Sequence, residues 1–292
     1  MRMSKMERMR ATLAGEPVDR PAVALWRHFP GDDQDPSALA AATVAFQREY
    51  DFDLVKVSPA SSFCLRDWGA QDEWLGNLEG TREYTLRPIR EPDDWLTLRT
   101  LEPTGGALGA QLQCLQMILA ELGSEVPVIQ TVFSPLAQAK NLVGEGQLVI
   151  HIRRFPEALH AGLSTIAETT ARFVTAAREV GVAGIFYAVQ QAQYGLLSEA
   201  EFGAFGRRYD LQVLEAARGL WCNVLHLHGT DVMFDQVRDY PVQVLNWHDQ
   251  ETAPSLGEGL QRFGGAVCGG LERWRDVVRG TPTLVRERAT AA

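Results

Sequence analysis

Short apolar runs alternate with segments of helical periodicity along most of the chain. Residues of a strand point alternately to opposite faces, whereas the apolar residues of a helix recur every three to four positions. This alternation, without hairpin turns outside one segment, predicts parallel βαβ units. We predict strands at residues 21–28, 54–59, 127–133, 184–189, 222–229, 242–248 and 266–270. A first helix is predicted within residues 1–20 and ends at residues 15–17. Residues 136–180 are predicted to form two or three helices, and single helices are predicted at 38–50, 106–122, 198–220, 232–239, 255–263 and 276–289.

Three successive strands of this set end in histidines or carry a cysteine. His226 and His228 lie two positions apart, so their side chains should project from the same side of one strand. His248 ends the next run, and Cys268 lies in the run after that. The chain has only six histidines and four cysteines, which makes this placement the main chemical signal in the sequence.

The predicted fold is an α/β barrel of the (β/α)8 TIM-barrel type, formed by a single domain over residues 1–292. Strand eight is not recognisable, so the chain is a truncated barrel, borrows a strand within an assembly, or has an open seam. Barrel enzymes place their active sites at the C-terminal ends of the strands. The residues predicted at that end are Arg27, His28, Gln190, His226, His228, His248 and Cys268.

Residues 61–102 interrupt the alternation of strands and helices. They contain the polar and aromatic stretches Trp68-Gly69 and Tyr84-Thr85-Leu86-Arg87 between strand two and the following helix. We interpret the segment as an insertion with a small β-hairpin over the barrel mouth.

Composition narrows the class of protein. With 292 residues and 46% hydrophobic content, the chain can bury a large core. A formal net charge of -9 argues against a nucleic-acid-binding surface, which needs a basic face. No apolar run reaches the roughly 18 residues of a membrane span, and no signal-peptide core is visible, so we expect a cytoplasmic protein. The four cysteines form no CxxC pair and are expected to be reduced thiols.

Five short motifs occur along the chain in an order typical of one family. They are Leu13-Ala14-Gly15-Glu16-Pro17-Val18-Asp19-Arg20-Pro21, Tyr50-Asp51-Phe52-Asp53, Asp67-Trp68-Gly69, Leu245-Asn246-Trp247 and Gly280-Thr281-Pro282. The sequence resembles the uroporphyrinogen decarboxylase superfamily, which also holds cobalamin-linked, zinc-dependent methyltransferases. The resemblance implies a TIM-barrel fold and a homodimer whose cavities face each other.

The two branches of that superfamily imply different chemistry. In the decarboxylases an arginine after strand one holds substrate carboxylates, a role that falls on Arg27, whereas their aspartate after strand two falls on Pro59. The methyltransferases bind zinc through a His-x-Cys-Gly motif at the end of strand five. His226 matches its histidine, and His228 replaces its cysteine. The resemblance thus implies zinc at His226 and His228, with His248 or Cys268 able to complete a different ligand set.

Three protein ligands and an open position suffice for zinc to bind a thiolate or acidify water. The predicted metal ligands are His226, His228, His248 and Cys268, and the alternative is a metal-free polar pocket. Arg27 and His28 are predicted to form an anion clamp, the alternative for Arg27 being a surface ion pair. The residues predicted to contact substrate are Arg27, Tyr187, Gln190, Gln191 and Trp247.

Three hypotheses of function follow. The favoured one is a zinc-dependent methyltransferase that acts with a thiol or corrinoid partner on a substrate with acidic groups, and uses Arg27, His28 and the three histidines in catalysis. The second is a decarboxylase or lyase acting on a porphyrinogen-like carboxylate. The third is a non-catalytic protein that binds a tetrapyrrole or corrinoid.

Overall fold

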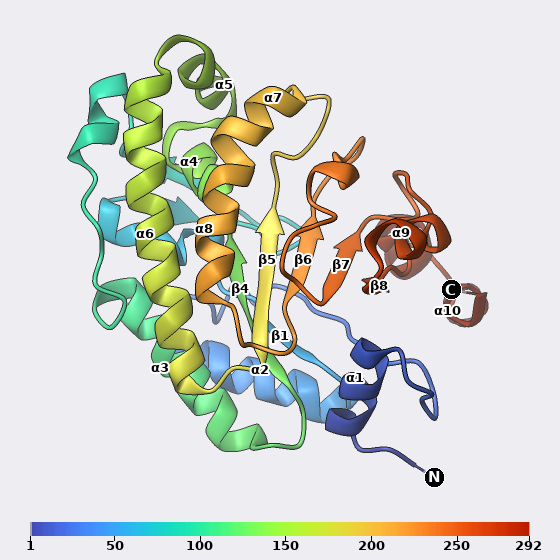
Figure 1. Cartoon of the computed structure of the whole chain (residues 1–292). Coiled ribbons are helices and arrows are strands. Elements are labelled where there is room, and N and C mark those ends of the chain that lie inside the picture. Colours follow the sequence, from blue (N-terminus) through green and yellow to red (C-terminus); the bar gives the residue numbers. More distant parts are fainter. Residues whose placement is uncertain (1, 292) are drawn as a thin grey trace.

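A parallel β-sheet forms the centre of the molecule in the computed structural model, which describes residues 2–291. The strands of this sheet lie next to one another in the order in which they occur in the sequence. Each crossover therefore leads to the adjacent strand, as in TIM-barrel-like folds. Helices cover its outer face (Figure 1). The strands are β1 (Val55–Val57), β4 (Val128–Phe133), β5 (Gly184–Val189), β6 (Val224–Leu227), β7 (Val244–Trp247) and β8 (Ala266–Cys268). The predicted α/β, TIM-barrel-like fold class is confirmed.

The predicted helices are present with one exception, and the one predicted at residues 276–289 is divided at residues 279–281 between the π-helix η6 (Arg273–Val278) and α10 (Pro282–Ala291). Helices α6 (Pro156–Val180) and α8 (Arg208–Ala216) lie side by side over β4 and β5 (Figure 1). Residues 232–239 form only the 3-10 turn η5 (Phe234–Gln236), because their start is hydrogen-bonded to the loop after β5, from Tyr194 N to Asp231 O at 3.0 Å and from Met233 N to Ala192 O at 2.8 Å. No helix within residues 2–291 is long and apolar enough to cross a membrane. The helices are α1 (Lys5–Ala14), α2 (Pro36–Tyr50), α3 (Gly106–Leu122), α4 (Pro135–Val143), α5 (Glu145–Arg154), α6 (Pro156–Val180), α7 (Glu199–Phe202), α8 (Arg208–Ala216), α9 (Leu256–Phe263) and α10 (Pro282–Ala291).

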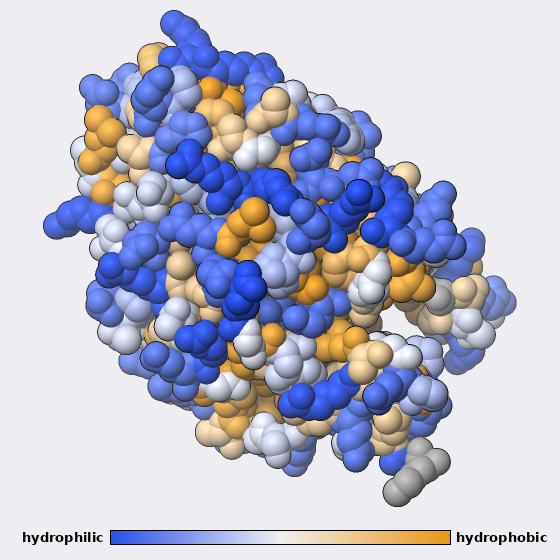
Figure 2. Space-filling model, in the orientation of Figure 1, coloured by the Kyte–Doolittle hydropathy of each residue, from blue (hydrophilic) through white to orange (hydrophobic). Residues whose placement is uncertain are grey.

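The prediction of a strand at residues 21–28 is wrong. The segment is extended and meets the sheet through one backbone hydrogen bond, from Asp53 N to Val23 O at 2.9 Å. Val23 and Leu25 are each 52% exposed, and only the alternate residues Ala22, Ala24 and Trp26 pack against the core. The sheet of the described residues therefore has β1 and β8 as its two edges. Figure 2 shows an opening between the C-terminal segment and the rest of the molecule.

A buried aspartate fixes this extended segment. The Asp53 carboxylate accepts hydrogen bonds from Val23 N at 2.9 Å and from Arg8 Nη1 at 2.7 Å, and pairs with Arg20. Arg8 also binds Asp19 through two nitrogen atoms. Two of the motifs that carry the family resemblance are therefore structural, because they close the N-terminal segment against the start of β1.

The insertion contains the predicted hairpin. Strands β2 (Gln71–Glu73) and β3 (Glu83–Leu86) pair antiparallel, with an irregular register at Gln71 and Asp72. The hairpin is anchored to the end of β1, where the hydroxyl groups of Tyr84 and Ser61 lie 2.9 Å apart. Residues 80–84 line a cavity together with residues that follow β4 and β5. The insertion thus lies at the C-terminal ends of the strands.

Candidate metal centre and adjoining cavity

Three of the six histidines converge at the C-terminal ends of β6 and β7. His226 lies in β6, His228 follows it, and His248 follows β7. Their ring centroids are 5.4–5.7 Å apart, so they form a nearly equilateral triangle. One potential ligand atom of each lies within 4.8 Å of the others. The pleat places His226 and His228 on one face, and the parallel register brings His248 beside them.

Asn246 fixes the protonation of the deepest histidine. Its amide nitrogen donates to the Cys268 carbonyl oxygen at 2.8 Å, so its amide oxygen is the atom that faces His226. That oxygen lies 2.6 Å from His226 Nδ1, which must therefore carry the proton. The lone pair of His226 is left on Nε2, and a ligating histidine commonly donates its other ring N–H to such an outer acceptor.

Burial keeps the three imidazoles neutral at neutral pH. Burial, with a smaller contribution from the other two histidines, lowers the pKa of His226 well below its usual value. Burial lowers the pKa of His228 to about 4, and also lowers that of His248. A neutral imidazole has a lone pair that it can donate to a metal. Three protonated imidazoles at this spacing would repel one another and would have no lone pair to donate.

The donor set fits a transition metal such as zinc. Ligand nitrogen atoms around a tetrahedral zinc ion are about 3.3 Å apart for bonds of about 2.0 Å. One potential ligand atom of each of His226, His228 and His248 lies within 4.8 Å of the others. Three imidazoles leave a fourth position open for an exogenous ligand, as in catalytic zinc sites.

Cys268 does not belong to this group in the structure. Burial raises the pKa of its thiol to about 11, so the sulfur is protonated. Its Sγ lies 3.9 Å from the Gly269 carbonyl oxygen, and its backbone oxygen accepts a hydrogen bond from Asn246 at 2.8 Å. The predicted fourth ligand thus acts here as an anchor for the amide that orients His226.

A cavity of about 470 Å³ lies between the hairpin, α4 and the loop after β5. Arg82 in its wall is neutralised by Asp33 and Asp72. Arg87 donates to the Asn141 carbonyl oxygen and stands 4.8 Å over the Tyr84 ring. Within residues 2–291, neither Arg87 nor Lys140 has a carboxylate in salt-bridge range. Burial lowers the pKa of Lys140, and Glu145, a carboxylate that also lines the cavity, opposes this shift. Neither cation is held in a salt bridge within the described part of the chain, so both can meet an anionic ligand.

The structure separates the two residues of the predicted anion clamp. His28 lines the cavity, and burial together with Lys56 lowers its pKa to about 4. Arg27 is exposed, donates from Nε to the His28 carbonyl oxygen at 3.2 Å and lies 5.4 Å over the Phe29 ring. Neighbouring residues of an extended segment point in opposite directions, so the cavity receives His28 and not Arg27.

Two of the residues predicted to contact substrate face away from the site. Tyr187 is fully buried on the outer face of β5, where its hydroxyl donates to Asp210 of α8 at 2.7 Å. Trp247 donates to the Pro254 carbonyl oxygen at 2.8 Å and packs against Gly259 of α9, where a Cβ atom would lie 2.4 Å from its ring. The predictions for Tyr187 and Trp247 are wrong because each occupies the outward position of its strand.

The two glutamines predicted to bind substrate differ in position. Gln190 lines the cavity, and its side-chain oxygen has no partner within the part of the chain that the structure describes. Gln191 is 3% exposed and its side-chain oxygen is likewise unpartnered among residues 2–291. Gln190 is therefore the one able to donate to or accept from a ligand in the cavity.

Sequence reasoning missed Lys56, Arg87, Lys140 and Asn246. Lys56 carried a readable signal, because it is a charged residue in the middle of the apolar run Val55-Lys56-Val57. Asn246 carried one too, since it is two positions before His248 and so shares its face. Arg87 and Lys140 carried none, because only the folding of the hairpin onto α4 brings them together.

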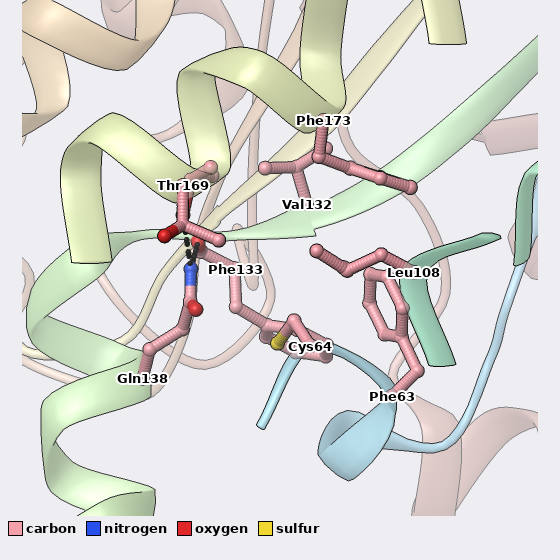
Figure 3. Close-up of a pocket in the computed structure, with 9 residues that line it drawn as sticks. Phe63, Cys64, Leu108, Val132, Phe133, Gln138, Thr169 and Phe173 are labelled. Carbon is pink, nitrogen blue, oxygen red and sulfur yellow. Dashed lines mark hydrogen bonds between the residues drawn. The ribbon is translucent and has the colours of Figure 1, made fainter. Parts of the chain in front are cut away.

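An apolar void elsewhere is part of the core. It lies between α6, β4 and the 3-10 turn at Ser61–Cys64, and Phe63, Val132 and Phe173 point into it (Figure 3). Its volume of about 10 Å³ is no more than that of one water molecule. Gln138 borders it and donates to Phe133 O and Thr170 Oγ1, both at 2.8 Å. This void is too small for a substrate.

Comparisons of the sequence with known proteins indicate one family, and a comparison with solved structures indicates the fold. The family model described as uroporphyrinogen decarboxylase (URO-D) matches residues 4–292. Proteins named uroporphyrinogen decarboxylase from Rhodococcus opacus (strain B4) and Rhodococcus jostii (strain RHA1) are 34% and 33% identical over 137 residues. Those matches cover 45% of this chain and 37% of each relative. A solved structure, a methyltransferase from Methanosarcina mazei, has the same fold, with a TM-score of 0.77 and 18% identity over 92% of this chain and 83% of that one.

Proposed function

Because the chain belongs to the uroporphyrinogen decarboxylase family, we propose that it is an enzyme in which His226, His228 and His248 hold a zinc ion for methyl transfer involving a thiol. The observation that carries the proposal is the triangle of three neutral imidazoles at the C-terminal ends of β6 and β7. A methyltransferase with the same fold supports it. A corrinoid as the methyl-carrying partner is part of the same proposal and follows from the family resemblance.

Each part of the site has a role in this proposal. Zinc, when bound, would supply a Lewis acid that lowers the pKa of a thiol or a water at the open position. Asn246 holds the proton of His226 on Nδ1, so that Nε2 points its lone pair at the ligand position. Arg87 and Lys140 bind an acidic group of the substrate in the cavity, where the hairpin limits access of water.

A second candidate function is decarboxylation of a porphyrinogen-like carboxylate. It is supported by the two Rhodococcus relatives named uroporphyrinogen decarboxylase and by the unpaired cations of the cavity. The two functions differ in their need for metal. Carbon dioxide release from uroporphyrinogen by metal-free protein, lost in Arg87→Ala, would favour the decarboxylase.

Elemental analysis of the purified protein tests the first proposal. We expect close to one zinc per chain in the wild type and almost none in the His226→Ala, His228→Ala double variant. His160→Gln is the matched control, since His160 lies on α6, stacks on Phe205 at 4.3 Å and is remote from the site. Cobalt substitution gives an independent readout, because histidine ligation changes the visible absorption of the ion. Full metal content in the double variant would refute the proposal.

A further inference from the structure

Lysine is rare in this chain, and its placement is uneven. Of the 28 basic residues counted as Lys or Arg, only Lys5, Lys56 and Lys140 are lysines. Lys5 lies near the N-terminus and pairs with Asp51. Lys140 lines the cavity, and Lys56 lies in the sheet interior. Nearly all the other cations of the chain are arginines, so the two lysines in the cavity wall and in the sheet interior stand out.

Lys56 is the deeper of the two amines. It is the central residue of β1 and points to the interior, where its Nζ lies 4.6 Å from the Phe186 ring centroid and 5.5 Å from that of Trp26. Phe186 in turn stacks on His226, with 5.2 Å between centroids and 26° between planes. One aromatic ring therefore separates the amine from the three histidines.

Apart from these two aromatic rings, the protein offers this ammonium few partners. Its one hydrogen bond is to Ser58 Oγ at 2.9 Å, although an ammonium has three N–H donors. Among residues 2–291 no carboxylate lies in salt-bridge range of it. The titratable groups that sense its charge are His28 and His226, which carry no negative charge. Burial lowers the pKa of Lys56 to about 7, as expected of a cation without a counterion.

We propose that Lys56 binds the carboxylate of an organic acid that enters the barrel interior beside the three histidines. The two free N–H donors of the ammonium and its lack of a counterion are what such a group would satisfy. The rings of Trp26 and Phe186, which flank the ammonium, would pack against the apolar part of the same ligand. This inference goes beyond the proposed function, because it requires neither a metal nor methyl transfer.

Lysine-selective NMR of the metal-free protein tests the proposal directly. With ¹³C-labelled lysine the three side chains give three signals, which Lys5→Arg, Lys56→Met and Lys140→Met assign one by one. Acetate is the probe and acetamide its uncharged counterpart, both at constant ionic strength set with sodium chloride. We expect acetate to shift the Lys56 signal saturably and to raise the pKa at which that signal titrates. Acetamide should leave it in place, and the Lys5 signal should respond to neither.

A second NMR measurement, which observes the acetate and not the protein, compares acetate binding among the variants. Saturation transfer to the acetate methyl group should weaken about tenfold or more in Lys56→Met and persist in Lys56→Arg and Lys5→Arg, as expected for loss of a charged hydrogen bond. A Lys56 signal that does not move with acetate while the Lys140 signal does would overturn the proposal, because anion binding would then belong to the outer cavity. A Lys56 response to phosphate alone would overturn the assignment to a carboxylate. Both experiments use chelator-treated protein, so failure to find zinc would leave their outcome intact.

Discussion

The hydrogen bond between Asn246 and His226 gives the most direct test of how this centre is built. We expect Asn246→Ala to weaken zinc binding by about 10–100-fold, because loss of an outer partner of a ligating histidine typically costs that much. The corresponding free energy of binding is about 1.4–2.7 kcal/mol. An effect of this size is expected because both polar atoms of the Asn246 amide are hydrogen-bonded. Its oxygen lies 2.6 Å from His226 Nδ1, and its nitrogen lies 2.8 Å from the Cys268 carbonyl oxygen.

The physical reason is the choice of tautomer. Without the amide oxygen, His226 has no acceptor for its Nδ1 proton, and the ring can rotate or place its proton on Nε2, where it blocks the metal. Asn246→Asp should retain most of the affinity, because a carboxylate also accepts from Nδ1. Gln250→Ala is the matched control, since that exposed side chain bonds only Asp249 in the structure.

Competition with a chromophoric chelator measures the zinc affinity of each variant. Thermal unfolding of the metal-free proteins must accompany it, since the loss of a buried hydrogen bond is expected to cost about 1 kcal/mol of stability. A folded Asn246→Ala protein with wild-type zinc affinity would refute the tautomer argument. So would an equal loss of affinity in Gln250→Ala, because the effect would then not depend on His226.

Three further predictions concern stability and substrate binding. Burial raises the pKa of Asp210 to about 7, above the usual aspartate value of about 3.9, so the folded state retains a proton that the unfolded state loses. The free energy of unfolding should therefore decrease by at most about 4 kcal/mol as the pH rises from about 4 to about 7. Urea unfolding at several pH values should show this decrease in the wild type and not in Asp210→Asn. Lys56→Met should raise the free energy of unfolding by about 1–2 kcal/mol at pH 6, because it removes a buried cation without a counterion; a lower melting temperature would contradict this. The double variant Arg87→Ala, Lys140→Met should raise KM for an acidic substrate at least about tenfold, whereas Arg27→Ala, exposed in the structure, should leave KM unchanged.

The period of the hydrophobic pattern was sufficient to predict the parallel α/β architecture. Helix α3 and strands β4 and β5 fall almost where the periodicity places them, because each element must bury its own apolar face. The same local rule predicted that His226 and His228 share a face. It misled for residues 21–28, whose apolar side chains alternate but are partly exposed. Their place is set by the distant Asp53 carboxylate.

Only the tertiary structure decided which side chains meet. The rule that places His226 and His228 together also turns Tyr187 and Trp247 outward, but applying it requires knowing which residue of each strand faces inward. Local sequence predicts that alternation, whereas register across β6, β7 and β8 joins His226 to Asn246 and Cys268. The cavity beside them depends on contacts between the hairpin and α4, which are distant in sequence. Sequence therefore determined the elements and their chemistry, and long-range packing determined the site.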